Sequence, residues 1–180
     1  EFRRVLFRSA VVGRDVDINQ SVARPAATQD VIVAAAESST IRSVAGAPAV
    51  SFQKDAVGVG FDLGNVERHA VVWVGRGTAI KAARDVKVDA DDTDSLRSVA
   101  AALGVGVGGE AGGGSVSFWD VDAEVRAETE AGLSSARPGA EFAAGGGVFV
   151  TADGTFSVMQ VAGNVAVSGG GSGVALGLTV

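Results

Sequence analysis

The sequence predicts an all-β fold in which repeats stack into a β-solenoid, and three observations lead to this fold class. Similar segments recur at spacings of 55 and 62 residues, apolar and polar residues alternate within them, and the composition suits closely stacked strands. Hydrophobic residues make up 47% of the chain but are mostly Ala and Val, aromatic residues make up only 6%, and 26 residues are Gly. We therefore expect a narrow and repetitive core.

The repeats are defined by segments that return in the same order. Residues 30–34 (DVIVA) return at 85–89 (DVKVD) and 147–151 (GVFVT), and eleven residues after each start lies a second shared segment, at 41–45, 96–100 and 158–162. A third segment matches 57–61 with 114–118, a fourth matches 70–74 with 123–127, and a shorter echo of the first lies at 14–18. Residues 10–180 are thus one solenoid segment, with a partial repeat at 10–29, complete repeats at 30–84 and 85–146, and a truncated repeat at 147–180.

Each repeat is expected to supply two or three coils of roughly 20–25 residues. Asp30, Asp85 and Gly147 would mark turns between faces, and inward Val, Ala, Ile and Phe would stack on their equivalents in neighbouring coils. One stretch also fits a helix, because residues 94–104 carry apolar residues at helical spacing between a possible N-cap and Gly104. The matching residues 41–50 contain a Gly and a Pro, so we expect strands in all copies.

The first nine residues, EFRRVLFRS, differ from the rest of the chain in carrying three Arg and two Phe. They do not form a secretory signal, because Arg8 interrupts the apolar stretch after three residues and a signal needs roughly 7–15. Residues 6–9 can be encoded by CTC TTC CGA TCT, which resembles the end of a sequencing adaptor. We therefore expect residues 1–9 to be a foreign leader outside the fold, on an internal piece of a longer protein.

The charge balance argues against two classes of partner. The chain has 15 basic and 21 acidic residues, and removing Arg3, Arg4, Arg8 and Glu1 leaves 12 and 20, so the net charge moves from −6 to −8. Nucleic acids and anionic lipids need clustered Lys and Arg, so neither is expected to bind. No Cys is present for a disulfide or thiolate metal site. No apolar stretch approaches the roughly 18 residues of a membrane span, so membrane insertion is not expected.

The order of the segments, DVxVxA, a polar linker, a Gly-rich apolar stretch, SVSF and AxVxA, resembles the repeats of very large bacterial exoproteins of the filamentous haemagglutinin and autotransporter adhesin type. It is carried by residues 85–90, 98–114, 115–118 and 123–127. The resemblance implies a right-handed parallel β-helix that acts as a stalk, export to the cell surface, and a role in biofilm or in attachment to a host, matrix or neighbouring-cell surface. The rest of the same long chain would stack at both ends. The resemblance carries over no catalytic residues and no cofactor.

The sharpest candidate site is the acidic run at 89–94, in which four carboxylates could coordinate a hard cation such as Ca²⁺: Asp89, Asp91, Asp92 and Asp94. The run lacks the Gly and Glu that an EF-hand loop needs at its sixth and twelfth positions. We expect a solvated turn, with calcium binding as the alternative.

An enzyme remains a second alternative, because parallel β-helices also carry polysaccharide lyases and hydrolases. The one credible cluster of acidic and basic residues for such a reaction is Asp89, Asp91, Asp92, Lys87 and Arg97.

Other features fit packing better than chemistry. Residues 104–109 match G-x-G-x-x-G, but the Gly-rich stretch after them cannot readily form the helix that a dinucleotide site needs. His69 is the single His and no G-x-S-x-G elbow accompanies it, so we expect an exposed loop histidine rather than a Ser-His-Asp triad. Trp73 and Trp119 could stack on sugars, but they differ in repeat position and are expected to pack. Residues 75–77 and 169–173 are expected to be turns or tight coils.

Overall fold

The computed structural model describes residues 2–19, 28–134 and 138–180, and within these ranges the chain is all-β, as predicted. The described residues include no helix that could cross a membrane. All strand pairs are parallel, and they form sheet A (β1-β4-β7-β10), sheet B (β2-β5-β8) and sheet C (β3-β6-β9). The strands are β1 Phe2–Val12, β2 Asp17–Ile18, β3 Val31–Ser51, β4 Ala56–Val74, β5 Ala79–Ala82, β6 Val86–Gly106, β7 Ala111–Thr129, β8 Glu141–Ala144, β9 Val148–Ser168 and β10 Gly173–Thr179.

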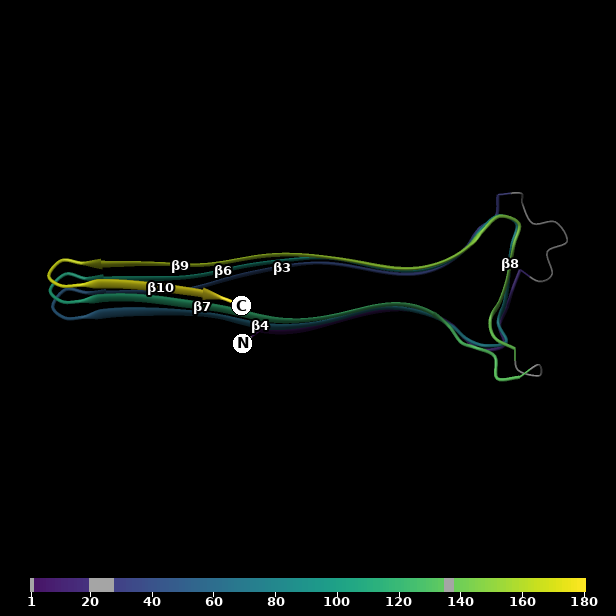
Figure 1. The fold of residues 1–180 in the computed structure, drawn as a ribbon, viewed down its shortest axis with the longest axis horizontal. Helices are drawn as coiled ribbons and strands as arrows, with labels where there is room; N and C mark the ends of the chain where they lie inside the picture. Colours follow the sequence, from purple (N-terminus) through teal and green to yellow (C-terminus); the bar gives the residue numbers. More distant parts are fainter. Residues whose placement is uncertain (1, 20–27, 135–137) are drawn as a thin grey trace.

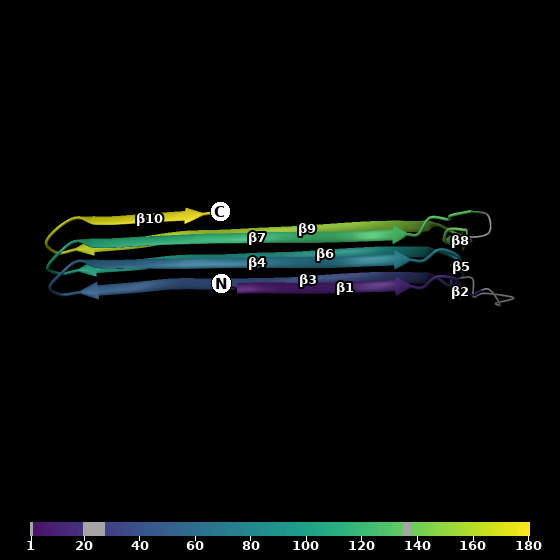
Figure 2. The ribbon, with the colours of Figure 1, turned by 90° about the horizontal axis from the view of Figure 1, so that it is seen from below.

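Successive strands belong to successive sheets, so the chain passes through sheets A, B and C and returns to sheet A beside the strand it left. The result is a flattened, solenoid-like coil (Figure 1). Sheets A and C are long and face each other, and short sheet B closes one end. At the other end, which we call the hairpin end, turns at 52–55, 107–110 and 169–172 lead from sheet C to sheet A. Figure 2 shows the coils stacked one on the next.

Each repeat forms one coil, so the expectation of two or three coils per repeat is wrong. Residue 31 pairs with residue 86 and residue 86 with residue 148, so a coil takes 55 or 62 residues. The strands are long, and inward and outward side chains keep alternating even where apolar and polar residue types do not. In β6 every second residue is buried over all 21 positions, through the acidic run and into the Gly-rich stretch. Residues 94–104 are therefore strand, as expected, and not helix.

The strand register agrees with the first two repeated segments and corrects the others. Residues 41–45 lie beside 96–100, which lie beside 158–162. The third segment was matched two residues too late, since Phe61 pairs with Val116 and not with Phe118. The fourth was matched two residues too early, since Ala70 pairs with Val125 and not with Ala123. A strand pattern of period two looks alike after a shift of two residues, which explains the error. The echo at 14–18 is also misassigned, because β2 pairs with β5.

Residues 2–9, expected outside the fold, lie in β1 and pair with β4 from Gly64 to Val71. Glu1 lies outside the described residues. Parallel strands pair through the backbone N–H and C=O groups, which every residue except Pro has in full. The pairing of residues 2–9 with β4 therefore does not show whether this segment is native or foreign. That residues 1–9 are foreign stays a prediction.

Asp30 and Asp85 mark the corner at which the coils enter sheet C, as expected. The Oδ1 atom of Asp30 accepts the N–H of Asp85 at 3.2 Å, and the Oδ1 atom of Asp85 accepts the N–H of Gly147 at 2.9 Å. A hydrogen bond and ion pair from Arg84 lower the pKa of Asp30 to about 2. Each carboxylate therefore links its own coil to the next one at the equivalent residue.

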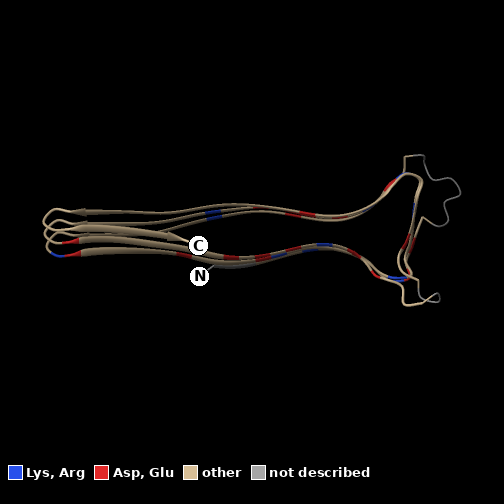
Figure 3. Cartoon of the chain, viewed as in Figure 1, with Lys and Arg blue, Asp and Glu red and all other residues tan. Residues whose placement is uncertain are grey.

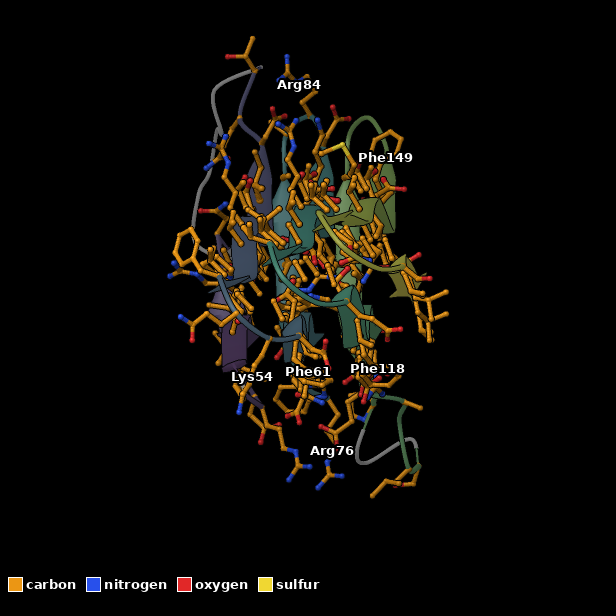
Figure 4. The ribbon with its side chains drawn as sticks, turned by 90° about the vertical axis from the view of Figure 1, so that its left-hand side faces the viewer. Lys54, Phe61, Arg76, Arg84, Phe118 and Phe149 are labelled. Carbon is orange, nitrogen blue, oxygen red and sulfur yellow. The ribbon has the colours of Figure 1, made fainter. Side chains whose placement is uncertain are left out.

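The core lies between the sheets and changes along their length. Near sheet B, one cluster joins all three sheets: Ala35, Val72, Val74, Ile80, Ala82, Val86, Val88 and Ala90. Midway along the strands lies a second cluster of Ile41, Val66, Leu96 and Trp119. The expected inward stacking thus holds for Val, Ala and Ile, but several Phe side chains lie on the outer faces, namely Phe61, Phe118 and Phe149 (Figure 4).

Toward the hairpin end the inward residues become Gly, Ala and Ser, and sheets A and C approach closely. A Cβ atom at inward Gly104 would clash with the carbonyl oxygen of Gly112 in the facing sheet and lie 3.2 Å from that of Ala56. Gly114 lies on the outer face, where a Cβ atom would meet nothing within 4 Å. The close approach therefore depends on inward glycines.

Replacing Gly104→Ala is expected to lower the free energy of unfolding by about 1–3 kcal/mol, because the added methyl group must push two backbones apart. Gly114→Ala is the matched control, with an expected change within about 0.5 kcal/mol. Urea and thermal melts followed by circular dichroism measure both. Equal effects at the two positions would contradict the close approach of the sheets.

Candidate functional site

The acidic run at 89–94 is part of strand β6, so the expected solvated turn is wrong. Asp92 and Asp94 point into the core and are only 5% and 4% exposed, whereas Asp89 and Asp91 lie on the outer face of sheet C. The alternation of a strand buries every second side chain, whether it is apolar or charged. The four carboxylates lie on opposite faces and do not converge. In the part of the chain that the structure describes, no three or more His, Cys, Asp or Glu side chains are placed so that they could hold one metal ion.

The two inward carboxylates meet Arg68, which β4 presents from the facing sheet. The Arg68 side chain is 1% exposed, and its Nη1 atom lies 3.5 Å from Oδ2 of Asp92 and forms a closer ion pair with Asp94. Glu37 is a third buried carboxylate, adjacent to Asp92 in the register, and it accepts a 3.0 Å hydrogen bond from Nε of Arg8 in β1. We call Arg8, Glu37, Arg68, Asp92 and Asp94 the ionic cluster.

Burial dominates the electrostatics of the ionic cluster. Burial raises the pKa of Asp92; the charge of Arg68 opposes this effect and that of Glu37 adds to it. Burial also lowers the pKa of Arg68, against the attraction of Asp92 and Glu37. The ionic cluster contains two guanidinium groups and three carboxyl groups, so the carboxyl groups outnumber the cations. None of the Arg68 nitrogens makes a hydrogen bond of good geometry, which makes the site costly to form.

Phe156 closes the ionic cluster on the side of β9. Its ring lies 4.8 Å from Cζ of Arg68, in a cation–π contact. The small cavity beside them, also lined by Ser39 and Asp94, has no room for a water molecule. The arrangement therefore joins coils through buried charge and offers no space for a substrate.

A second buried cluster of polar side chains is centred on Asp62. No motif in the sequence identifies Asp62. Its carboxylate accepts hydrogen bonds from Ser43 Oγ at 2.5 Å, from Ser98 Oγ, and from Trp119 Nε1 at 3.1 Å. The hydroxyls of Ser98 and Ser117 share a further bond of 2.6 Å. Burial acts to raise the pKa of Asp62, but these hydrogen bonds outweigh it and hold the pKa below its usual value. The network links sheets A and C across neighbouring coils.

The residues suggested for an enzyme do not form one cluster. A shallow groove of about 360 Å³ on the outer face of sheet C holds Lys87, Asp89 and Asp91, together with Asp85, Phe149, Thr151 and Asp153. The Thr151 hydroxyl donates a hydrogen bond to Asp89. Asp92 lies in the core and Arg97 is exposed further along β6, away from this groove.

The remaining candidates are structural. His69 lies in β4 and not in an exposed loop; it is partly buried, with Nδ1 3.0 Å from Oε2 of Glu124 in β7. Trp119 is packed in the core, as expected, and Trp73 lies in a cation–π contact with Arg14, 5.9 Å from ring centroid to Cζ. Residues 104–109 end β6 and turn into β7, so no helix follows them.

The glycine turns also stand as expected. Residues 75–78 join β4 to β5, and residues 169–172 join β9 to β10. Gly77 has a φ of +70°, a left-handed conformation that Gly adopts without strain.

No protein-family model matches the chain, and no curated protein or solved structure shows significant similarity to it. The candidate function therefore rests on the geometry of the chain itself.

Replacing Arg68→Met is expected to lower the free energy of unfolding by about 3–5 kcal/mol, because it leaves buried carboxylates without their cation. The triple variant Arg68→Met/Asp92→Asn/Asp94→Asn is expected to recover part of this loss. Urea denaturation at neutral pH measures both.

The control for this prediction is Arg97→Met on the exposed face of β6, where a change within about 0.5 kcal/mol is expected. A loss at Arg68 no larger than that at Arg97 would show that the ionic cluster contributes nothing to stability.

Replacing Asp62→Asn is expected to lower the free energy of unfolding by about 1–3 kcal/mol at pH 7, because the ionised acceptor of several buried donors is removed. The pKa of Asp62 is depressed in the folded state, so its contribution is present above the unfolded pKa and lost as pH falls through the folded pKa. The difference between wild type and variant should therefore shrink in acid. Melts from pH 7 to about pH 3 test this, with Asp91→Asn on the outer face as control; a difference independent of pH would contradict it.

Proposed function

We propose that the chain is a structural stalk segment of an exported bacterial surface adhesin or exoprotein, folded as a right-handed parallel β-helix. The observation that carries this proposal is the stacking of whole repeats in register, with residue 31 beside 86 and 86 beside 148. Each repeat adds one coil to three continuous sheets. Attachment to a host, matrix or neighbouring-cell surface would be made mostly by regions outside this segment.

The strand edges support continuation of the stack. Strand β3 is at one edge of sheet C and β9 is at the other, so each has one unpaired side. An exposed edge strand is a template for pairing with more chain. In a longer protein of this type, preceding and following coils would cover both edges.

Two alternatives have less support from the geometry. A polysaccharide lyase or hydrolase would use the outer groove at Asp89 and Asp91, but Asp92 and Arg97 do not reach it. A calcium-binding module would need the carboxylates of the acidic run on one face, and they alternate between two.

Duplicating residues 85–146 in tandem within the full chain tests the proposal. The extra repeat should insert one coil, lengthen the molecule along its stacking axis by about 4.8 Å, and raise the melting temperature through one more interface between coils. Small-angle X-ray scattering and a thermal melt provide the two measurements. A separate second transition, or an extra segment that scatters as unfolded chain, would show that a repeat is not a stacking unit.

A further inference from the structure

The half of the molecule nearest the hairpin end contains few charged residues (Figure 3). Beyond Arg42 and Arg97 on sheet C and Asp120 on sheet A, the described strands place no charged side chain outward until the turns, which hold Lys54, Asp55 and Glu110. The outward positions are occupied by Val, Leu, Phe, Pro, Ala and Gly instead. An apolar surface this continuous marks an interaction site on a soluble protein.

On sheet C this surface is hollowed into a groove. The register aligns Gly46, Ala101 and Gly163 in one row across β3, β6 and β9. The row two residues before consists of Val44, Val99 and Val161, and the row two residues after consists of Pro48, Leu103 and Val165. The small residues form the floor of an open groove of about 700 Å³ along the stacking axis. Pro48, Leu103 and Val165 line one side of this groove, and Val44, in the row on the other side of the small residues, is 82% exposed.

The outer face of sheet A has rows of large side chains where sheet C has a groove. The register aligns Phe61, Val116 and Leu178 in one row and places Leu63 beside Phe118 in the next. Phe61 is 61% exposed. These rows also run along the stacking axis. On sheet C, the two rows on either side of the small residues are four residues apart, or roughly 13 Å, which leaves room for one row of large side chains between them.

We propose that a second copy of this chain docks on this half of the molecule, with one large row of sheet A in one copy, that of Phe61, Val116 and Leu178, seated in the sheet C groove of the next. The matched relief favours a copy over a lipid surface, and the net charge of −6 disfavours an anionic membrane. Three strands of about ten residues give roughly 480 Å² per face, so the pair covers roughly 1,000 Å², the lower bound for a specific interface. This inference is independent of the proposed function.

The two contacting faces differ, so the contact is heterologous and does not close. The assembly keeps a free sheet A face at one end and a free sheet C face at the other, so further copies can add side by side. A symmetric pair of identical faces would instead stop at a dimer. The two arrangements respond differently to substitutions on single faces, which makes them separable.

The experiment uses the full chain and three single variants at exposed outward positions. Phe61→Lys blocks sheet A, Leu103→Lys blocks the sheet C groove, and Thr40→Lys is the control on the polar part of β3. Sedimentation velocity over a range of concentrations should show wild type and Thr40→Lys growing beyond dimers, more so with added sulfate. Either blocking variant alone should be monomeric. An equimolar mixture of the two should form dimers and nothing larger, because one intact face of each kind remains.

Other results would overturn the proposal. A wild type that stays monomeric has no such contact, and association lost with only one blocking variant would mean a symmetric contact. Association unchanged in both blocking variants would place the contact at the strand edges. Binding of monomeric wild type to phosphatidylcholine vesicles would make a lipid surface the occupant. Circular dichroism melts verify that the variants fold, and the mixed dimer requires both to be folded.

Discussion

Parallel stacking in register sets each side chain directly beside its equivalent in the next coil, and the rest of the structure depends on this constraint. Val31, Val86 and Val148 stack in this way, as apolar positions allow. The same rule sets Glu37 beside Asp92, two carboxylates on neighbouring strands about 4.8 Å apart in the core. Such a pair is tolerable only with a cation nearby, and Arg68 provides one from the facing sheet. The ionic cluster is therefore a consequence of stacking.

Inward and outward residues change together along the strands. Near sheet B, Val and Ile fill the space among three sheets, and the outer faces carry charged side chains, such as Lys87 and Asp91, beside exposed apolar ones such as Ile32. Toward the hairpin end the inward residues are Gly, Ala and Ser, which bring the sheets together but bury little apolar area. The large apolar residues of this half lie outside, on the faces. Here the backbone ladders hold the strands together within each sheet, and the Asp62 network joins sheet A to sheet C.

The all-β fold and the register of the first two segments were predictable because similar residues recur at fixed spacings. The length of a coil was not, because Gly marks turns such as 169–172 and also lines the inside of strands, as at Gly104. The burial of Asp92 could not be predicted from the sequence either. A run of charges usually faces solvent, and its cation, Arg68, lies on another strand 24 residues earlier (92 − 68). Asp62 likewise depends on donors from other strands.

The size of the coil bears on function. A coil of 20–25 residues gives the same rise of about 4.8 Å as this one, which takes 55 or 62. The additional residues of each coil do not increase the length of the stack along its axis; they widen the two facing sheets. Because stacking repeats every surface row along the axis, a groove or ridge on those sheets grows with each added coil. Weak contacts between rows then reinforce one another in proportion to the number of coils, so a broad stack of this kind is suited to lateral association as well as to extension.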